Sequence, residues 1–232
     1  NTAGLLVDCL SHIFGSDLPD RPEVIVVDNG STDESVERVR KAFPDVNVIE
    51  AGRNLGFAAA NNRAASEAHG QFLLLVNTDA MLEADCAARL MQLMEENLRA
   101  GMAGPQLLNA DGSAQTSYEA VPTLATETLN RSLLKRIFPH RFPHRSRVLH
   151  GPTEVEALIG AVMLLRREAF DELAGFDEDY FFFLEETDLA VRMRDAGWQV
   201  VHEPRARAAH LQGGTAKTYH AAARIEFYRS RY

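Results

Sequence analysis

Three acidic residues directly follow three phenylalanines in FFFLEETDLAVRMRDAG, the stretch that spans residues 181–197. Negative charge is favoured near a helix N-terminus, so Glu185, Glu186 and Asp188 fit the first turn of a solvated helix. That interpretation does not explain why an apolar run leads into them. The alternative is that one of these carboxylates is partly desolvated and takes a proton as a general base.

Helical spacing separates the three acids. At about 100° per residue, Glu186 falls on an apolar stripe, whereas Asp188 lies on the other side, spaced i,i+4 from Arg192 for an ion pair. The other members of the stripe are Leu189, Ala190 and Met193. Burial on this stripe raises the pKa of a carboxylate towards that of a useful base. Glu186 is therefore the candidate base, Asp188 is structural or a minor competitor, and Glu185 stays unassigned.

Two predicted strands end in turns that carry acids. VIVVDNGSTDES ends its strand at Asp28, which Asn29 follows, and LLLVNTDAM ends in Asn77 and Asp79. In open α/β sheets, ligands bind beyond the carboxyl ends of the strands. Asp, Asn, Gly and Ser are also ordinary turn and capping residues, so each turn alone has a structural explanation. Two such turns at one sheet edge favour a shared site.

Common phosphate-binding loops are missing after the predicted strands. Neither G-x-G-x-x-G nor G-x-x-x-x-G-K-[ST] occurs there. A hard divalent cation held by one or two carboxylates is then the obvious way to neutralise a phosphate, and Asp79 is well placed as its ligand. The segment 52–64 adds a glycine-bounded turn at the start of a helix. The N-terminus of that helix could receive an anion or the edge of a base. The alternative is that its alanines simply pack closely against the sheet.

Strands and helices alternate along the first half of the chain. Strands are predicted at 23–28, 46–51, 71–77 and 101–109, and helices at 4–14, 33–43, 58–68 and 83–100. This order indicates an α/β fold built from βαβ units around a parallel sheet that is covered on both faces. Because a sheet that begins on a helix looks truncated, we expect that a first strand is missing.

The second half is less regular. From about 113 to 153 the sequence is rich in Pro, Thr, His and Arg, which predicts a long loop or a short-helix insertion. Regular structure resumes at 154–167, with helices near 167–173 and 185–197 and strands at 198–203 and 206–210. A basic, aromatic amphipathic helix is expected at 217–232. We find no repeat and no linker, so one domain over 1–232 is expected.

Composition excludes several classes of protein. No stretch approaches the roughly 18 apolar residues of a membrane span, and no signal-peptide pattern opens the sequence. Two cysteines, Cys9 and Cys86, are too few for a disulfide framework, which favours a reducing cytoplasm. The net charge of −9 argues against nucleic-acid binding.

Charge is unevenly distributed, however. Residues 131–150 hold six Lys/Arg, three His and no acid. This segment and the tail 217–232 either face an anionic membrane surface or a pyrophosphate-linked lipid, or are a solvated loop and an ordinary helix.

Five motif-like segments follow one another along nearly the whole chain: VIVVDNGSTDES, NLGFAAANN, LLLVNTDA, GAVMLLRREAFDELAGFDEDYFFFLEETDLAVRMRDAGW and ARAAHLQGGT. Together they resemble the family-2 glycosyltransferases of the GT-A fold, especially the bacterial rhamnosyltransferase-like members. The resemblance implies a Rossmann-like, mostly parallel central sheet flanked by helices, with an insertion near 113–153. It also implies a nucleotide-sugar-binding half at 1–109 and an acceptor-binding half at 110–216.

The resemblance assigns the donor-binding residues. Asp28, with Asn29 beside it, contacts the nucleotide base, while Asn54 and Gly56 line the nucleotide pocket. Asn77-Thr78-Asp79 stands where the family has D-x-D, so an amide replaces the first acid. Asn77 then contacts the donor, and Asp79 is the one sure carboxylate ligand of a Mg²⁺ or Mn²⁺ ion.

Three further positions follow from the same resemblance. His210 completes the metal site, although a histidine at a strand end is ordinary by itself. Gly160 and Ala161 let the backbone approach the sugar closely, and strand packing explains them almost as well.

Glu186 matches the second acid of the family's E-D-x-D-like helix start, with Glu where Asp is usual, one methylene longer. The implied reaction is inverting: Glu186 takes the proton of an acceptor hydroxyl while the metal stabilises the departing nucleoside diphosphate. The donor is of the dTDP-rhamnose type or a UDP-sugar. The acceptor is a cell-surface glycan or a lipid-linked sugar, and the enzyme works in the cytoplasm or peripherally at the inner face of the membrane.

Two other functions stay open at the level of sequence. A sugar-nucleotidyltransferase has a related fold but normally shows a glycine-rich basic loop after its first strand. A catalytically silent nucleotide-sugar or glycan-binding domain is the second, because Asn77 and Glu186 both depart from the family pattern.

Overall fold

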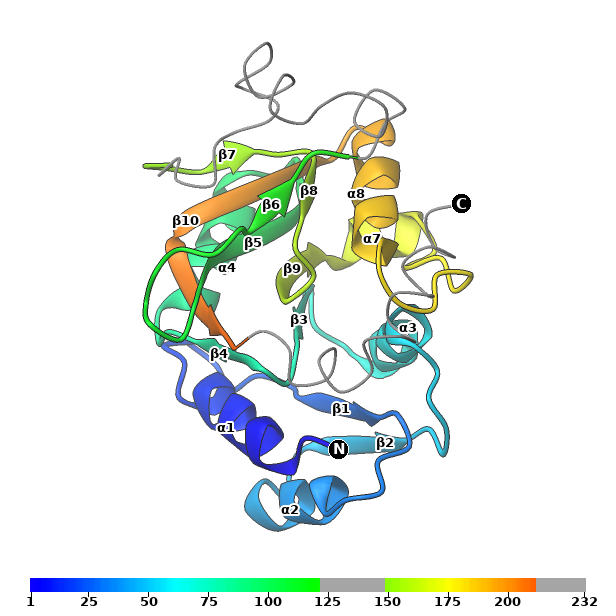
Figure 1. Ribbon diagram of the computed structural model, residues 1–232. Helices are drawn as coiled ribbons and strands as arrows, with labels where there is room; N and C mark the ends of the chain where they lie inside the picture. The colour runs from blue at the N-terminus through cyan, green and yellow to red at the C-terminus, as the bar shows by residue number, and fades with distance from the viewer. Residues whose placement is uncertain (122–148, 212–232) are drawn as a thin grey trace, which may run out of the picture.

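A computed structural model describes residues 1–121 and 149–211 of the chain. The helix predicted at 217–232 and nearly all of the basic segment 131–150 lie outside these ranges. Up to β5 the helices and strands alternate as the sequence predicts, apart from the short strand β4, which directly follows β3 (Figure 1).

The N-terminal elements form a small unit. Strands β1 (Ile25–Asp28) and β2 (Asn47–Glu50) pair in parallel, as expected for two strands joined by a helix, here α2 (Ser35–Ala42). Helix α1 (Ala3–Phe14) packs against α2 (Figure 1). The buried residues between these elements are Leu6, Leu10, Val39 and Val46.

A six-stranded sheet forms the larger part of the molecule, in the order β3-β9-β5-β10-β4 with β7 also pairing with β10. Its strands are β3 (Phe72–Val76), β4 (Ala80–Leu82), β5 (Ala100–Leu108), β7 (Thr153–Glu154), β9 (Val162–Arg166) and β10 (Gln199–His210). β3, β5 and β10 share one direction, whereas β9, β4 and β7 run against their neighbours. The sheet is therefore mixed rather than purely parallel, because β9 enters between β3 and β5 from the opposite end.

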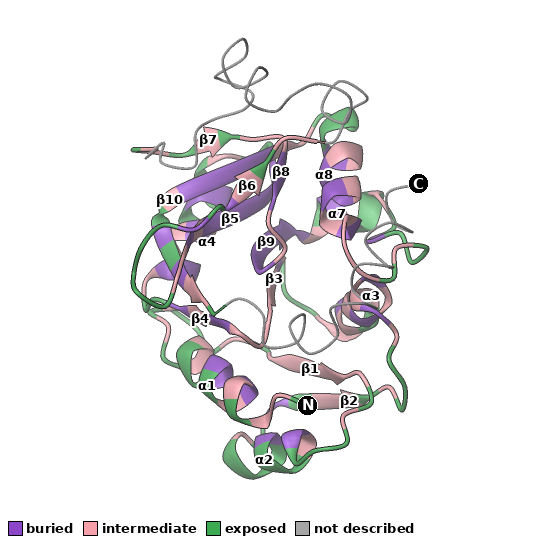
Figure 2. Ribbon diagram, in the orientation of Figure 1, coloured by how far each residue is buried: buried purple, intermediate pink, exposed green. Residues whose placement is uncertain are grey.

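Helices cover this sheet and bury its central strands (Figure 2). α4 (Cys86–Glu96) packs on β5 and β10, α7 (Arg167–Glu172) on β9, and α8 (Glu185–Asp195) on β10 and on the short strand β8 (Ala157–Leu158). α3 (Phe57–Glu67) contacts β1. The predicted α/β class is confirmed.

Two details differ from the sequence-based expectation. The strands predicted at 198–203 and 206–210 are one strand, β10, with a register shift between Glu203 and Arg207. Pro204 has no N–H for the ladder, and a bulge is where a sheet tolerates such a residue. The predicted insertion also carries order at its ends, since β6 (Tyr118–Glu119) pairs with β8 in antiparallel register.

None of the helices within residues 1–121 and 149–211 combines the length and the hydropathy that a membrane crossing requires.

Candidate active site

Glu186 lies in the first turn of α8 with its carboxylate turned inward. The stripe predicted from helical spacing is present, because Leu189, Ala190 and Met193 are fully buried. The Oε2 atom of Glu186 is buried and has no hydrogen-bond partner among the described residues. Burial raises the pKa of Glu186 to about 7, the charge of Glu119 adds to this, and a backbone hydrogen bond from Gly160 opposes it. This carboxylate suits a general base near neutral pH.

Asp188 has the structural partner that its spacing predicts. Its Oδ2 accepts a hydrogen bond from Nε of Arg192 at 2.7 Å. Arg192 also donates from Nη1 to the carbonyl oxygens of Leu173 and Gly175, each at 3.0 Å. The ion pair thus ties α8 to the chain that precedes it. Asp188 therefore has a structural partner, whereas Glu185 and Glu186 each keep a buried oxygen without a hydrogen-bond partner among the described residues.

Glu185, which the sequence left unassigned, is the more deeply buried neighbour, with only 4% of its surface exposed. Its Oε2 also lacks a hydrogen-bond partner within the described part of the chain. Burial raises the pKa of Glu185 to about 8, and the charge of Glu186 adds to the shift. A neutral Glu185 beside an ionised Glu186 avoids placing two unscreened charges in one site.

The two turns assigned to the nucleotide are locked together. Asn29 donates from Nδ2 to the carbonyl oxygen of Gly56 at 3.1 Å, and its Oδ1 accepts the Leu55 N–H at 3.2 Å. Asn54 closes its own turn by accepting the Gly56 N–H at 3.0 Å. Asp28 accepts the N–H groups of the turn that follows it, including that of Ser31 at 3.1 Å. Each of these three side chains, those of Asp28, Asn29 and Asn54, therefore stabilises a turn, in addition to any contact with a nucleotide.

Gly56 joins these turns to the phenylalanine segment. It has φ +85°, and a Cβ there would meet the carbonyl oxygen of Phe181 directly and Cδ2 of the same residue at 2.9 Å. That carbonyl accepts the Phe57 N–H at 3.0 Å. Only glycine fits such a position. The left-handed residues Phe183 (φ 75°) and Leu184 (φ 70°) then lead directly into α8.

Asp79 and His210 converge at the other side of the site. Nε2 of His210 lies 3.6 Å from Oδ1 of Asp79, and the Leu211 N–H donates to the Asp79 carbonyl at 2.9 Å. Nδ1 of His210 lies 2.8 Å from Oε1 of Gln115. With the proton on Nδ1, the ring donates to Gln115 and presents its Nε2 lone pair beside Asp79, as metal-binding histidines do. Burial lowers the pKa of His210, which favours the neutral, ligating form.

The described residues contain no group of three or more His, Cys, Asp or Glu side chains that could hold a metal ion. Two protein ligands still fit a Mg²⁺ or Mn²⁺ ion, since such ions keep several waters and bind one or two carboxylates together with substrate phosphates. Asp79 and His210 thus suit a cation that arrives with a diphosphate, and they do not form a closed structural site.

Asn77 and Ala161 connect the turn that carries Asp79 with the turn that lies against Glu186. The Asn77 N–H donates to the carbonyl oxygen of Ala161 at 2.9 Å. Ala161 is 1% exposed and belongs to the core, so strand packing accounts for it better than an approach to a sugar. Gly160, next to it, lies against Glu186. One chain of contacts therefore runs from Asn77 through this turn to the candidate base.

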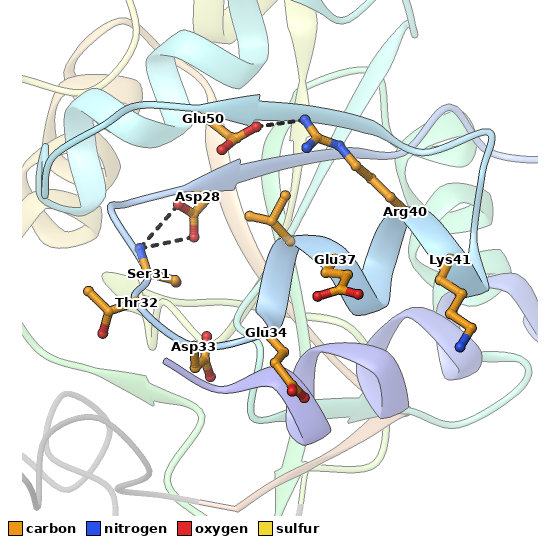
Figure 3. A pocket seen from close by; sticks show the side chains of 10 residues that line it. Asp28, Ser31, Thr32, Asp33, Glu34, Glu37, Arg40, Lys41 and Glu50 are labelled. Atoms are coloured by element: carbon orange, nitrogen blue, oxygen red, sulfur yellow. Dashed lines mark hydrogen bonds and ion pairs between the residues drawn. The ribbon is translucent and has the colours of Figure 1, made fainter.

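A cavity of about 760 Å³ opens beside Asp28, at the end of β1 (Figure 3). Five carboxylates and two basic side chains stand in its wall, and Arg40 is already paired with Glu50 at 2.7 Å. The charged lining residues are Asp28, Asp33, Glu34, Glu37, Glu50, Arg40 and Lys41. This wall repels a diphosphate and contains neither Asp79, His210 nor Glu186, so the cavity is not where a sugar would be transferred.

Comparison with known proteins identifies the family. Residues 1–174 match the family described as Glycosyl transferase family 2, and residues 140–220 match a second one, the N-terminal domain of galactosyltransferase. The chain belongs to glycosyl transferase family 2. This confirms the resemblance found in the sequence motifs and, with it, a glycosyltransferase domain of GT-A fold.

Two similar proteins are named for rhamnosyl transfer and for O-antigen biosynthesis. An N-acetylglucosaminyl-diphospho-decaprenol L-rhamnosyltransferase of Mycobacterium tuberculosis is 30% identical over 82% of this chain and 67% of its own length. The O-antigen biosynthesis protein RfbC of Myxococcus xanthus is 25% identical over 84% of this chain and 15% of its own. The chain thus spans about two thirds of the first relative and a small part of the second.

Solved structures support the GT-A fold. The mannosyltransferase PcManGT of Pyrobaculum calidifontis, in complex with GDP-Man and Mn²⁺, superposes with a TM-score of 0.67 at 22% identity, over 97% of this chain and 57% of its own. GalNAc-T7, with UDP, GalNAc and Mn²⁺, superposes with a TM-score of 0.65 at 17% identity, over 90% of this chain and 42% of its own.

The glycosyltransferase domain also contains site residues that the sequence-based analysis missed. Gln115 holds His210, yet it lies inside the stretch predicted to be irregular, and no motif marks it. Glu119, on β6, acts electrostatically on Glu186 and lies in the same stretch. Their roles depend on pairings between distant segments, so spacing along the chain gives no signal for them.

Glu185 leads to a prediction on stability. Its ordinary pKa of 4.5 is raised to about 8 in the folded protein, so the unfolded chain releases this proton at lower pH than the folded chain does. Stability therefore falls as pH rises from about 4.5 to about 8. Glu185→Gln removes the penalty, and its free energy of unfolding should exceed that of the wild type by roughly 2–4 kcal/mol at pH 8 and by little at pH 5.

Urea unfolding at pH 5, 6, 7 and 8 measures this difference. Glu168→Gln, the same change at an exposed glutamate of α7, is the matched control and should follow the wild type at every pH. A gap between Glu185→Gln and wild type that does not grow with pH would show that Glu185 is not buried in its neutral form.

Proposed function

We propose that this chain is the catalytic domain of an inverting glycosyltransferase that moves a sugar from a nucleoside-diphosphate donor to a hydroxyl group. The observation that carries the proposal is the buried Oε2 atom of Glu186, which has no hydrogen-bond partner among the described residues, together with the rise of the pKa of this carboxyl to about 7. Membership of glycosyl transferase family 2 supports the reaction class.

In the proposed reaction, the acceptor hydroxyl attacks the anomeric carbon from the side opposite the diphosphate. Glu186 takes the hydroxyl proton as the new bond forms, and the bond from the anomeric carbon to the diphosphate oxygen breaks. The products are the inverted glycoside, protonated Glu186 and a nucleoside diphosphate. A base with a pKa near the working pH is efficient in this role because it is ionised before the attack and still holds the proton afterwards.

The diphosphate end is assigned to Asp79 and His210, with Asn77 beside them. A divalent cation bound there supplies Lewis-acid stabilisation of the charge that develops on the leaving diphosphate. Asp28 and Asn29 are assigned to the nucleotide base, and Asn54 and Gly56 to the wall of its pocket. Because Asn29 and Gly56 are hydrogen-bonded to each other, the two turns act as one rigid support.

A rhamnose donor of the dTDP type and a lipid-diphosphate-linked sugar acceptor are the first substrates to test. The relative from Mycobacterium tuberculosis is named for rhamnosyl transfer to N-acetylglucosaminyl-diphospho-decaprenol, and this supports both choices. Work at the inner face of the cell membrane, through peripheral contact, follows from such an acceptor.

Thermal-shift measurements with dTDP-rhamnose, UDP-sugars and GDP-mannose, each with and without Mn²⁺, test the donor assignment. One donor should raise the unfolding temperature only in the presence of Mn²⁺, since a ligand at about 100 times its Kd adds about 2.7 kcal/mol of stability. Release of nucleoside diphosphate on addition of an acceptor should follow with the same donor.

Failure of every nucleotide-sugar to bind in the presence of Mn²⁺ or Mg²⁺ would overturn the proposal. Binding without turnover by the full-length protein would favour a silent nucleotide-sugar-binding domain. Turnover of a nucleoside triphosphate with a sugar phosphate would instead identify a sugar-nucleotidyltransferase.

A further inference from the structure

Gly160 lies in the turn between β8 and β9, directly against the candidate base. A Cβ added to Gly160 would lie 3.3 Å from Cδ and from Oε1 of Glu186, and 3.5 Å from its Cγ. All three of these nearest atoms belong to Glu186. The space that a side chain at position 160 would fill is therefore already occupied by the glutamate side chain.

The turn that carries Gly160 is fixed on both sides. The Ile159 N–H donates to the carbonyl oxygen of Ser117 at 3.0 Å, and the Ala161 N–H donates to that of Ile159 at 2.8 Å. The Ala161 carbonyl accepts the Asn77 N–H at 2.9 Å. Because this backbone has little freedom to retreat, a side chain at position 160 must displace Glu186 instead.

Length explains why the space is needed. Glutamate at position 186 is one methylene longer than an aspartate would be, which adds about 1.5 Å of reach. The longer side chain needs room beside the turn, and the missing Cβ of Gly160 supplies it. The backbone N–H of Gly160 also bonds the carboxylate and favours its charged form.

We propose that Gly160 is a positioning residue for the base: its missing side chain accommodates the extra methylene of Glu186 and sets where the carboxylate meets the acceptor hydroxyl. This inference rests on the proposed function and replaces the expectation that Gly160 serves the approach of the sugar. Glycine at 160 and glutamate at 186 form one matched pair, so a change at either position alters the effect of a change at the other.

A double-mutant cycle tests the pair. Gly160→Ala should lower kcat about tenfold with the donor KM within about twofold, because a small displacement of a reacting group is costly. In the Glu186→Asp background the same Gly160→Ala change should have almost no further effect, because the shorter side chain leaves the space free. Gly151→Ala is the matched control, since a Cβ there meets nothing within 4 Å. An equal loss in both backgrounds would overturn the proposal.

A measurement without substrate separates this proposal from the proposed function. In ¹³C-glutamate-labelled protein, the Glu186 carboxyl signal is assigned by its loss in Glu186→Gln. Gly160→Ala should raise the pKa of Glu186, because the displaced carboxylate loses the hydrogen bond from the Gly160 N–H. An unchanged titration with unchanged kcat would refute the contact, whether or not a donor is known.

Folding of the variants supplies the last control. If Gly160→Ala does not fold, the combination with Glu186→Asp should fold, because the clash is with the longer side chain. Failure of both variants to fold would show that the added Cβ clashes with some other group, and the proposal would be wrong.

Discussion

Glu186→Gln is expected to lower kcat about 10²–10⁴-fold, the range that a well-placed general base contributes. The amide has nearly the volume of the carboxylate, so the buried stripe of α8 stays filled, and the fold and the donor KM should change little. What is lost is the acceptor of the hydroxyl proton. Initial rates at saturating donor and acceptor, compared with donor affinity in the same variant, separate the two effects.

The pH dependence of the wild type gives the same test a second readout. The base must be ionised before it takes a proton, and the pKa of Glu186 is raised to about 7 in the folded protein. We therefore expect kcat to rise with pH up to about 7 and to level off above it. In Glu186→Gln this rise should disappear, and the small residual rate should not depend on ionisation at position 186.

Asp188→Asn is the matched comparison on the same helix. It breaks the 2.7 Å pair with Arg192 and should lower stability more than turnover per folded molecule. If Asp188→Asn abolished transfer while Glu186→Gln kept the wild-type rate, the base assignment would be wrong. The two variants therefore decide between the candidates that helical spacing alone could only rank.

The local part of this site was readable from the sequence. The burial of Glu186 and the pairing of Asp188 follow from positions three and four residues apart on one helix, and such spacing survives in any tertiary context. In the structure the Oε2 atom of Glu186 is buried and Asp188 pairs with Arg192, although the whole Glu185 side chain is more deeply buried than Glu186. The α/β class was readable for a similar reason, because strand and helix periods alternate along the chain.

The non-local part was not readable. β9 enters the sheet between two strands that precede it in sequence, and β10 continues across Pro204 through a bulge. Gln115 reaches His210 across 95 positions. No periodicity records such contacts, because they depend on which segments the folded sheet brings together. The contact of Gly160 with Glu186 could not be predicted from the sequence either, because it depends on which side chain the fold brings against this glycine.

Those non-local contacts explain how a site spread over the chain becomes rigid. The Asn29–Gly56 and Phe57–Phe181 bonds join three loops, and the Asn77–Ala161 bond joins two more. The first is donated by the side-chain amide of Asn29, and the other two join backbone groups alone. Preorganisation of this kind fixes the reacting groups before the substrates arrive, which is the condition under which orientation contributes to the rate.

At the metal end, Asp79→Asn should remove the effect of Mn²⁺ on donor binding and lower kcat/KM about 10²–10³-fold, as expected when several kcal/mol of leaving-group stabilisation are lost. The effect is large because Asn77 already replaces one acid of the usual pair. Within residues 1–121 and 149–211, Asp79 is the carboxylate that lies beside His210, at 3.6 Å, and an amide oxygen carries no compensating charge.

Gln115→Ala tests whether the orientation of His210 matters as much as its presence. Removing an outer partner of a ligating histidine typically costs 10–100-fold in metal affinity. The Mn²⁺ affinity of Gln115→Ala should therefore lie between that of the wild type and that of Asp79→Asn. Asp171→Asn, at an exposed aspartate of α7, should bind Mn²⁺ and donor as the wild type does. Calorimetric titration of Mn²⁺ in the presence of the donor measures the Mn²⁺ affinity of each variant and so gives their order. Equal Mn²⁺ affinity in all three variants would place the cation elsewhere, and the donor diphosphate with it.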